Sequence, residues 1–155
     1  MTELRWGERT WVMGIVNVTP DSFSGDGLAT AGRNEAAIVA AALQQASDFV
    51  ASGAQLLDVG GESSRPAQFY GDHPPVSADN EAARAIPVVA ALVGAFAGGA
   101  VVSIDTSKGS VARAALAAGA SMVNDVWAGR RDPDTVAAAA EAGAHLVLMH
   151  NKDLA

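Results

Sequence analysis

The sequence predicts an α/β protein built on a parallel β-sheet, and three observations support this class. Short apolar runs alternate with longer segments of helical periodicity along the whole chain. The apolar runs are continuous rather than alternating, as expected for parallel strands that are covered on both faces. The dipeptide Gly-Ala recurs after three helical segments and directly before an apolar run, at Gly53-Ala54, Gly119-Ala120 and Gly143-Ala144. Glycine at this position can take the left-handed conformation that ends a helix and returns the chain to the sheet.

Five strands and four helices are expected to alternate along the chain. The apolar runs typical of strands are 11–16, 55–59, 101–104, 122–126 and 145–149. The first helix is expected to begin after Asn34, a residue type favoured at the N-cap. The later helices are expected at about 78–96, 109–118 and 132–142, the last opening with Asp132 as N-cap and Pro133 in its first turn. A doubly wound sheet and a (β/α)8 barrel both satisfy this order, with right-handed crossovers in either case.

The composition excludes several classes of protein. The 155 residues are 50% hydrophobic with a formal net charge of −7, so neither a nucleic-acid surface nor an anionic-membrane surface is expected. No cysteine is present, which excludes a disulfide scaffold and fits a reducing compartment. Residues 1–10 contain no apolar segment of a secretory signal, so we expect a cytoplasmic protein. The uncharged stretch 86–104 is long enough to span a membrane, but Pro87 and Gly98-Gly99 favour a helix, a turn and a strand.

Polar residues gather where the expected strands end. They are Asn17, Asp58, Asp105, Asn124, Asp125 and His150. In parallel α/β folds the active site lies at the carboxyl ends of the strands and in the loops that follow them. We therefore expect the functional site at this edge of the sheet.

The first two loops contain residue types that suit phosphate and metal chemistry. Asn17 and Asp21 offer oxygen ligands of the kind that Mg²⁺ prefers, although a turn-rich surface loop has a similar composition. The second loop, 60–66, places Ser64 and Arg65 after two glycines, and these side chains can bind an oxyanion. The alternative for Arg65 is a surface ion pair with Glu62.

The ends of the third and fourth strands carry groups that can form hydrogen bonds with the edge of a heterocycle. Asp105 ends an apolar strand, where an unpaired carboxylate is costly, so a ligand with adjacent N–H donors would suit it. The alternative is a cap for the helix that begins near Gly109. Asn124 carries a donor and an acceptor on one planar group. Lys108 could bind phosphate or be a solvated helix-start residue, and His150 has no second histidine at metal-ligand spacing.

Together these residues resemble the dihydropteroate synthases, the folate-pathway members of the pterin-binding family. The resemblance is carried by 13–24 and 58–66, and by 103–107, 123–126 and 148–150, in the same order. It implies a (β/α)8 TIM barrel, of which residues 1–155 would be a partial pterin-binding domain with about the first five strands and four helices. It also implies Mg²⁺-assisted condensation of 6-hydroxymethyl-7,8-dihydropterin diphosphate with p-aminobenzoate, and a homodimer when the chain is complete.

The resemblance also implies a role for individual residues. Asp105 would be the catalytic residue, and with Asn124 it would hydrogen-bond the pterin ring. Asn17 would hold Mg²⁺ near the diphosphate. Further substrate contacts are implied at Ser64, Arg65 and Met149.

The sequence departs from the family pattern in three ways. Ser64 stands where threonine is usual, and 24–27 reads Ser-Gly-Asp-Gly instead of the more common Ser-Asp-Gly-Gly. The family's later aspartate, its lysine and its last-strand arginine and histidine have no counterparts within 155 residues. Because a (β/α)8 barrel needs roughly 250 residues, we expect this chain alone to have little or no synthase activity. The alternatives are a non-catalytic pterin-binding half-barrel and a pterin-dependent methyltransferase relative, which has no diphosphate leaving group to hold.

Overall fold

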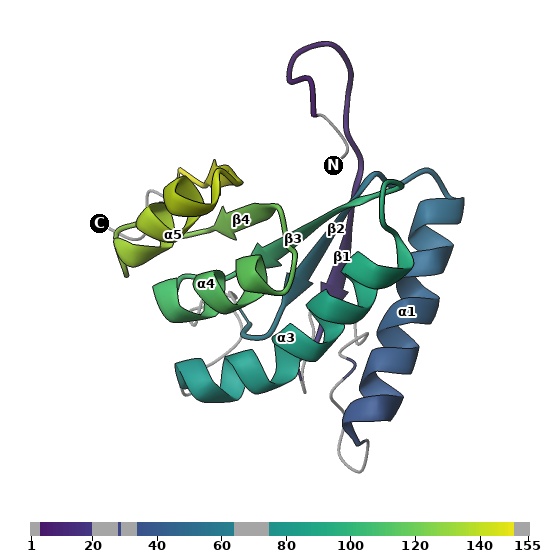
Figure 1. Ribbon diagram of the computed structural model, residues 1–155, viewed down its shortest axis with the longest axis horizontal. Helices are drawn as coiled ribbons and strands as arrows, with labels where there is room; N and C mark the ends of the chain where they lie inside the picture. Colours follow the sequence, from purple (N-terminus) through teal and green to yellow (C-terminus); the bar gives the residue numbers. More distant parts are fainter. Residues whose placement is uncertain (1–3, 20–27, 29–33, 64–74, 151–155) are drawn as a thin grey trace.

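The computed structural model describes residues 4–19, 28, 34–63 and 75–150. Within them the strands and helices follow one another as predicted, each within two residues of its expected bounds (Figure 1). The strands are β1 (Met13–Asn17), β2 (Leu56–Gly60), β3 (Val101–Asp105), β4 (Met122–Asp125) and β5 (His145–Leu148). The helices are α1 (Glu35–Ala51), α3 (Ala78–Ala95), α4 (Gly109–Ala117) and α5 (Asp134–Ala142).

The strand order resolves the ambiguity between a doubly wound sheet and a barrel. The five strands are all parallel, and each pairs with the next in the order β1-β2-β3-β4-β5. A doubly wound sheet would reverse this order at a switch point. The helices pack in the same succession, α1 on α3, α3 on α4 and α4 on α5, along one side of the sheet (Figure 1). This is part of a (β/α)8 barrel, as expected.

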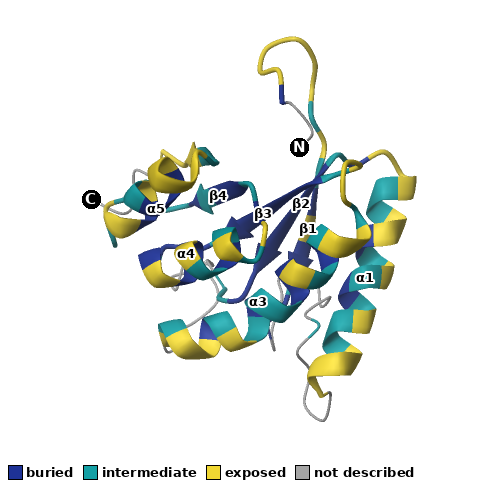
Figure 2. Cartoon of the chain, viewed as in Figure 1, coloured by how far each residue is buried: buried dark blue, intermediate teal, exposed yellow. Residues whose placement is uncertain are grey.

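The main core lies between the sheet and this row of helices. Large aliphatic side chains of the strands meet alanines and larger aliphatic residues of the helices, and Figure 2 shows the helices buried toward the sheet and exposed outward. The strand contribution consists of Val16, Leu57, Val59, Val102, Ile104 and Val123. At Gly14 a Cβ would come within 2.5 Å of the Phe49 ring, so only glycine lets α1 approach β1 this closely.

The opposite, inner face of the sheet is covered only in part. Near the amino ends of the strands Leu56, Val101 and Met122 are buried together with Leu4. Farther along, Ile15 on β1 is 56% exposed and Val147 on β5 is 37% exposed. The expectation that both faces are covered therefore holds fully only on the helix side.

The junctions between helices and strands follow the predicted turn chemistry, with one shift. Gly53, Gly119 and Gly143 have φ values of +99°, +103° and +63°, so each takes the left-handed conformation. Asn34 caps α1, since its Oδ1 accepts the Ala37 amide at 2.9 Å. At α5 the N-cap is Pro133 rather than Asp132, because the helix begins at Asp134. Asp132 still accepts the Asp134 amide at 3.0 Å.

The long uncharged stretch divides as expected between the end of α3, a glycine turn and β3. Among the described residues, no helix has both the length and the hydropathy needed to cross a membrane.

Candidate functional site

Three of the predicted site residues lie in one row across the carboxyl ends of the strands. Asn17 on β1 pairs in register with Gly60 on β2, which pairs with Asp105 on β3, which pairs with Asn124 on β4. Side chains in one row of a parallel sheet point to the same face. The structure therefore brings together Asn17, Asp105 and Asn124 on the inner face.

Gly60 leaves the space into which two of these side chains point. A Cβ at this position would lie 3.4 Å from Oδ1 of Asn17 and 3.9 Å from Oδ2 of Asp105. Because both oxygens border the same gap, one ligand placed above Gly60 can contact the two residues together. The conformational freedom of glycine is not needed here, since what matters is the missing side chain.

Asp105 is partly buried and has no hydrogen-bond donor among the described residues. Burial raises the pKa of Asp105 well above the usual value, and the charges of Asp58, Glu81, Asp125 and Glu62 raise it further. Its alternative role as a helix cap is wrong, because the first amide of α4, that of Gly109, donates to Oδ2 of Asp132 at 2.7 Å. The carboxylate of Asp105 is therefore available to a ligand that brings N–H donors or positive charge.

Asn124 is held by a residue to which the sequence assigned no role. Its Nδ2 donates to Oδ2 of Asp58 at 2.8 Å. Asp58 is only 4% exposed, and burial raises its pKa against the opposing effect of the Ser103 and Asn124 side chains. The signal for Asp58 was present in the sequence, as a charged residue inside the apolar run 56–59. Its partner could not be predicted, since Asn124 is 66 residues away.

Lys108 is partly buried and paired with two carboxylates, so it is not the solvated helix-start residue of the alternative interpretation. Its Nζ forms ion pairs with Glu62, after β2, and with Glu81, in the first turn of α3. Burial alone would lower the pKa of Lys108, but hydrogen bonds to the two carboxylates raise it above its usual value. Burial acts to raise the pKa of Glu62, but the hydrogen bond from Lys108 lowers it below its usual value. Lys108, in the loop after β3, thus connects the start of the loop after β2 with the first turn of α3.

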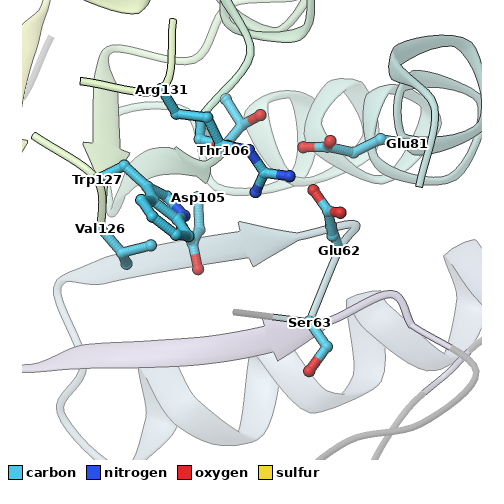
Figure 3. A pocket seen from close by; sticks show the side chains of 9 residues that line it. Glu62, Ser63, Glu81, Asp105, Thr106, Val126, Trp127 and Arg131 are labelled. Atoms are coloured by element: carbon cyan, nitrogen blue, oxygen red, sulfur yellow. The ribbon is translucent and has the colours of Figure 1, made fainter. Parts of the chain in front are cut away.

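A pocket lies at the carboxyl ends of β2, β3 and β4 (Figure 3). Its wall includes Asp105, Glu62 and Glu81 together with Trp127 and Arg131 from the segment after β4. The guanidinium of Arg131 points toward the two glutamates, and it lies 5.2 Å from the centre of the Trp127 ring. Neither Trp127 nor Arg131 was singled out from the sequence, because neither belongs to a recognisable motif.

Asn17 and Asn124 do not line this pocket, and two other strand-end residues also lie outside it. Asp125 is fully buried and accepts from the amides of Trp127 and Gly129, each at 2.8 Å, and from the Thr135 hydroxyl at 2.9 Å. It therefore anchors the segment between β4 and α5. Met149 follows β5 and is 41% exposed, and it is not among the residues that line the pocket.

The described residues can contribute to a magnesium site but do not form one by themselves. They contain no cluster of three or more His, Cys, Asp or Glu residues suited to a metal ion. Mg²⁺ commonly takes only one or two protein oxygens and completes its shell with water and substrate phosphates. The amide oxygen of Asn17, beside the gap above Gly60, fits this mode of binding. Asp21, Ser64 and Arg65 lie outside the described residues.

A protein-family model described as pterin binding enzyme matches residues 13–155. The chain belongs to the pterin-binding enzyme family. Dihydropteroate synthase of Streptococcus pyogenes serotype M1 is 47% identical over 142 residues, which cover 92% of this chain and 48% of that protein. This chain thus spans about half the length of the curated relatives it matches.

Solved structures of pterin-binding enzymes show the same architecture. A crystal structure of dihydropteroate synthase from Clostridium difficile in the presence of pteroic acid matches with a TM-score of 0.81 and 40% identity, over 97% of this chain and 52% of that one. Dihydropteroate synthase of Xanthomonas albilineans with 4-aminobenzoic acid matches with a TM-score of 0.73 and 40% identity, over 94% of this chain and 48% of that one. The predicted family and the barrel fold are therefore confirmed.

Proposed function

We propose that this chain forms the N-terminal half of the substrate site of a dihydropteroate synthase. The complete protein would condense 6-hydroxymethyl-7,8-dihydropterin diphosphate with p-aminobenzoate and release dihydropteroate and diphosphate. The observation that carries the proposal is Asp105, a carboxylate without a donor in the described part of the chain, in one row with Asn124 and Asn17. The ligands named for the Clostridium and Xanthomonas structures, pteroic acid and 4-aminobenzoic acid, support the same chemistry.

The inner-face residues would bind and orient the pterin. Asp105 would accept hydrogen bonds from ring N–H groups, which satisfies a carboxylate that has no donor among the described residues. Its negative charge would also stabilise the positive charge that develops on the pterin methylene as the diphosphate departs. Asn124 would add its free amide groups to the same ring edge. The amine nitrogen of p-aminobenzoate then forms the new C–N bond, the C–O bond to diphosphate breaks, and the amine loses a proton.

The leaving group would lie toward β1. Asn17 would hold Mg²⁺ through its amide oxygen, and the ion when bound would neutralise part of the diphosphate charge. We further propose that Ser64 and Arg65 contact p-aminobenzoate and the diphosphate and that Met149 contacts substrate. A homodimer of the complete protein and its cytoplasmic location stay predictions.

A chimeric enzyme tests this function. Residues 13–150 would replace the matching half of the Clostridium difficile synthase, and dihydropteroate formation would be measured. We expect turnover, and we expect the Asp105→Asn chimera to lose about 100-fold or more in kcat/KM, the usual cost of removing one electrostatic contact to a transition state. A folded chimera that binds pterin without condensing it would instead support the non-catalytic half-barrel.

The 155-residue chain provides the complementary measurement. Titration with 6-hydroxymethyl-7,8-dihydropterin should show binding, whereas the condensation assay should show little or no product. Turnover by this chain at the rate of a full-length relative would contradict the expectation that half the barrel is insufficient.

A further inference from the structure

We propose that Asp58 is a positioning residue that fixes the orientation of the Asn124 side-chain amide and thereby sets which hydrogen-bonding edge of a ligand is recognised beside Asp105 on the inner face. The orientation is a property of this chain alone. Its consequence for ligand choice rests on the function proposed above, because it assumes a pterin-like heterocycle as the ligand.

The contact spans three strands on the inner face. Asp58 lies on β2 and Asn124 on β4, so their side chains meet above β3. The β3 residue in register with Asp58 is Ser103, whose small side chain leaves room for the contact. Asn124 itself is in register with Asp105, so the amide held by Asp58 lies beside the carboxylate that the ligand would contact.

An ionised carboxylate permits only one orientation of the amide. A carboxylate has no hydrogen to donate, so Asn124 must turn its nitrogen toward Asp58 and not its oxygen. The opposite orientation would bring two oxygen atoms together without a hydrogen between them. With Nδ2 donating to Asp58 at 2.8 Å, the Oδ1 of Asn124 makes no hydrogen bond among the described residues and is left for a ligand donor.

Asp58 is buried and acts through Asn124. It is 4% exposed, whereas Asn124 is only partly buried, and neither residue lines the pocket that Asp105 borders. The second oxygen of Asp58, Oδ1, is buried and makes no hydrogen bond in the described part of the chain. A buried carboxylate with an unpaired oxygen costs the fold free energy, and the contact with Asn124 gives Asp58 a role in the site.

The orientation has a defined consequence for specificity. Asn124 then offers an acceptor and one remaining N–H, and Asp105 adds a second acceptor, so the two favour a ligand edge rich in N–H donors. A pterin carries a 2-amino group on this kind of edge, whereas a lumazine carries a carbonyl oxygen there. A freely rotating amide could donate to that carbonyl, and the preference for the pterin would fall.

The test compares Asp58→Asn with a matched surface control. An asparagine at 58 can both donate and accept, so it no longer dictates how Asn124 turns. The control is Asp48→Asn, because Asp48 accepts from Nε2 of Gln44 at 3.1 Å on the exposed side of α1 and repeats the amide-to-carboxylate contact far from the pocket. Circular dichroism would show that each variant is folded.

Two measurements distinguish the orientation of the Asn124 amide from its effect on ligand preference. In nitrogen-edited NMR spectra the two side-chain protons of Asn124 should be well separated in the wild-type chain and should approach each other in Asp58→Asn but not in Asp48→Asn. In titrations with 6-hydroxymethylpterin and 6-hydroxymethyllumazine, the preference for the pterin should fall about tenfold in Asp58→Asn and stay unchanged in the control. Unchanged NMR signals and an unchanged preference in folded Asp58→Asn would overturn the proposal.

A measurement on the wild-type chain covers the case in which Asp58→Asn does not fold. One of the two Asn124 side-chain protons should exchange with solvent more slowly than the other, because only one is bound to Asp58. Equal exchange of both protons would contradict the proposal. If the wild-type chain binds no pterin, the proposed function fails, while the NMR and exchange data still decide whether Asp58 fixes the amide.

Discussion

Two aspartates end neighbouring strands of this sheet and lie in opposite environments. Asp125, at the end of β4, is fully buried and accepts from two backbone amides and the hydroxyl of Thr135 on α5. Asp105, at the end of β3, faces the inner side of the sheet and has no donor among the described residues. The two carboxyl groups have the same chemistry and similar positions in the sequence pattern, yet only one is satisfied by the protein itself.

The difference separates residues that serve the fold from residues that serve the site. A buried carboxylate with partners stabilises the chain around it, whereas one without partners costs free energy until a ligand supplies donors. By this criterion the helix side of the β4 end is structural, and the inner side, with Asp105 and Asp58, is functional. Opposite responses to substitution should reveal the contrast.

The largest expected effect is a loss of stability in Asp125→Ala. The change leaves the amides of Trp127 and Gly129 without their acceptor and leaves the Thr135 hydroxyl with only the backbone carbonyl of Asp132. We expect the free energy of unfolding to fall by about 3 to 5 kcal/mol, since each buried donor left unpaired costs about 1 kcal/mol or more. Urea denaturation followed by circular dichroism measures this loss. The control Asp134→Ala removes an exposed carboxylate from the first turn of α5 and should cost at most about 1 kcal/mol.

The next effect has the opposite sign, a gain of stability in Asp105→Asn at neutral pH. Because burial and neighbouring carboxylates raise the pKa of Asp105 in the folded chain, the folded state binds this proton more tightly than the unfolded state, whose aspartate pKa is about 3.9. The ionised form therefore destabilises the fold increasingly as pH rises through the folded pKa. A neutral asparagine avoids this penalty, and we expect a gain of about 1 to 3 kcal/mol at pH 7.

The pH dependence of that gain distinguishes electrostatics from packing. At a pH well below the unfolded pKa of about 3.9 the wild-type Asp105 is protonated in both states, so the advantage of Asp105→Asn should vanish. A gain that is equal at both pH values would mean that the substitution acts through packing. Pterin binding should weaken in the same variant, in contrast to Asp125→Ala, whose main loss is in stability.

The sequence was sufficient to predict the fold because its determinants are local. Apolar runs, helical periodicity and the three Gly-Ala junctions each act within a few residues, and all of them predicted the observed elements. The row of Asn17, Asp105 and Asn124 was also predictable, since the carboxyl ends of parallel strands share one edge. The strand order that distinguishes a barrel from a doubly wound sheet is not local, and the resemblance to a known family supplied it.

The contacts that complete the site could not be predicted from the sequence, because they join residues that are far apart along the chain. Lys108 pairs with Glu62 and Glu81, which are 46 and 27 positions away. The first amide of α4, that of Gly109, donates to Asp132, 23 positions later, and so the local alternative of Asp105 as the cap was wrong. In each case several charged residues in the sequence were equally eligible as partners, and only the packed structure selects one.

The smallest expected effect concerns Ala128, in the turn that Asp125 anchors. Ala128 has a φ of +55°, a left-handed conformation that costs a residue with a Cβ about 1 to 2 kcal/mol. Ala128→Gly should remove this strain, and the greater freedom of glycine in the unfolded chain offsets part of the gain. We therefore expect the free energy of unfolding to rise by about 0.5 to 1 kcal/mol. Ala90→Gly, at an exposed site within α3, should instead lose about 1 kcal/mol. If both glycine variants lose stability, the turn stores no strain, and the three hydrogen bonds to Asp125 hold Ala128 in a conformation that costs nothing.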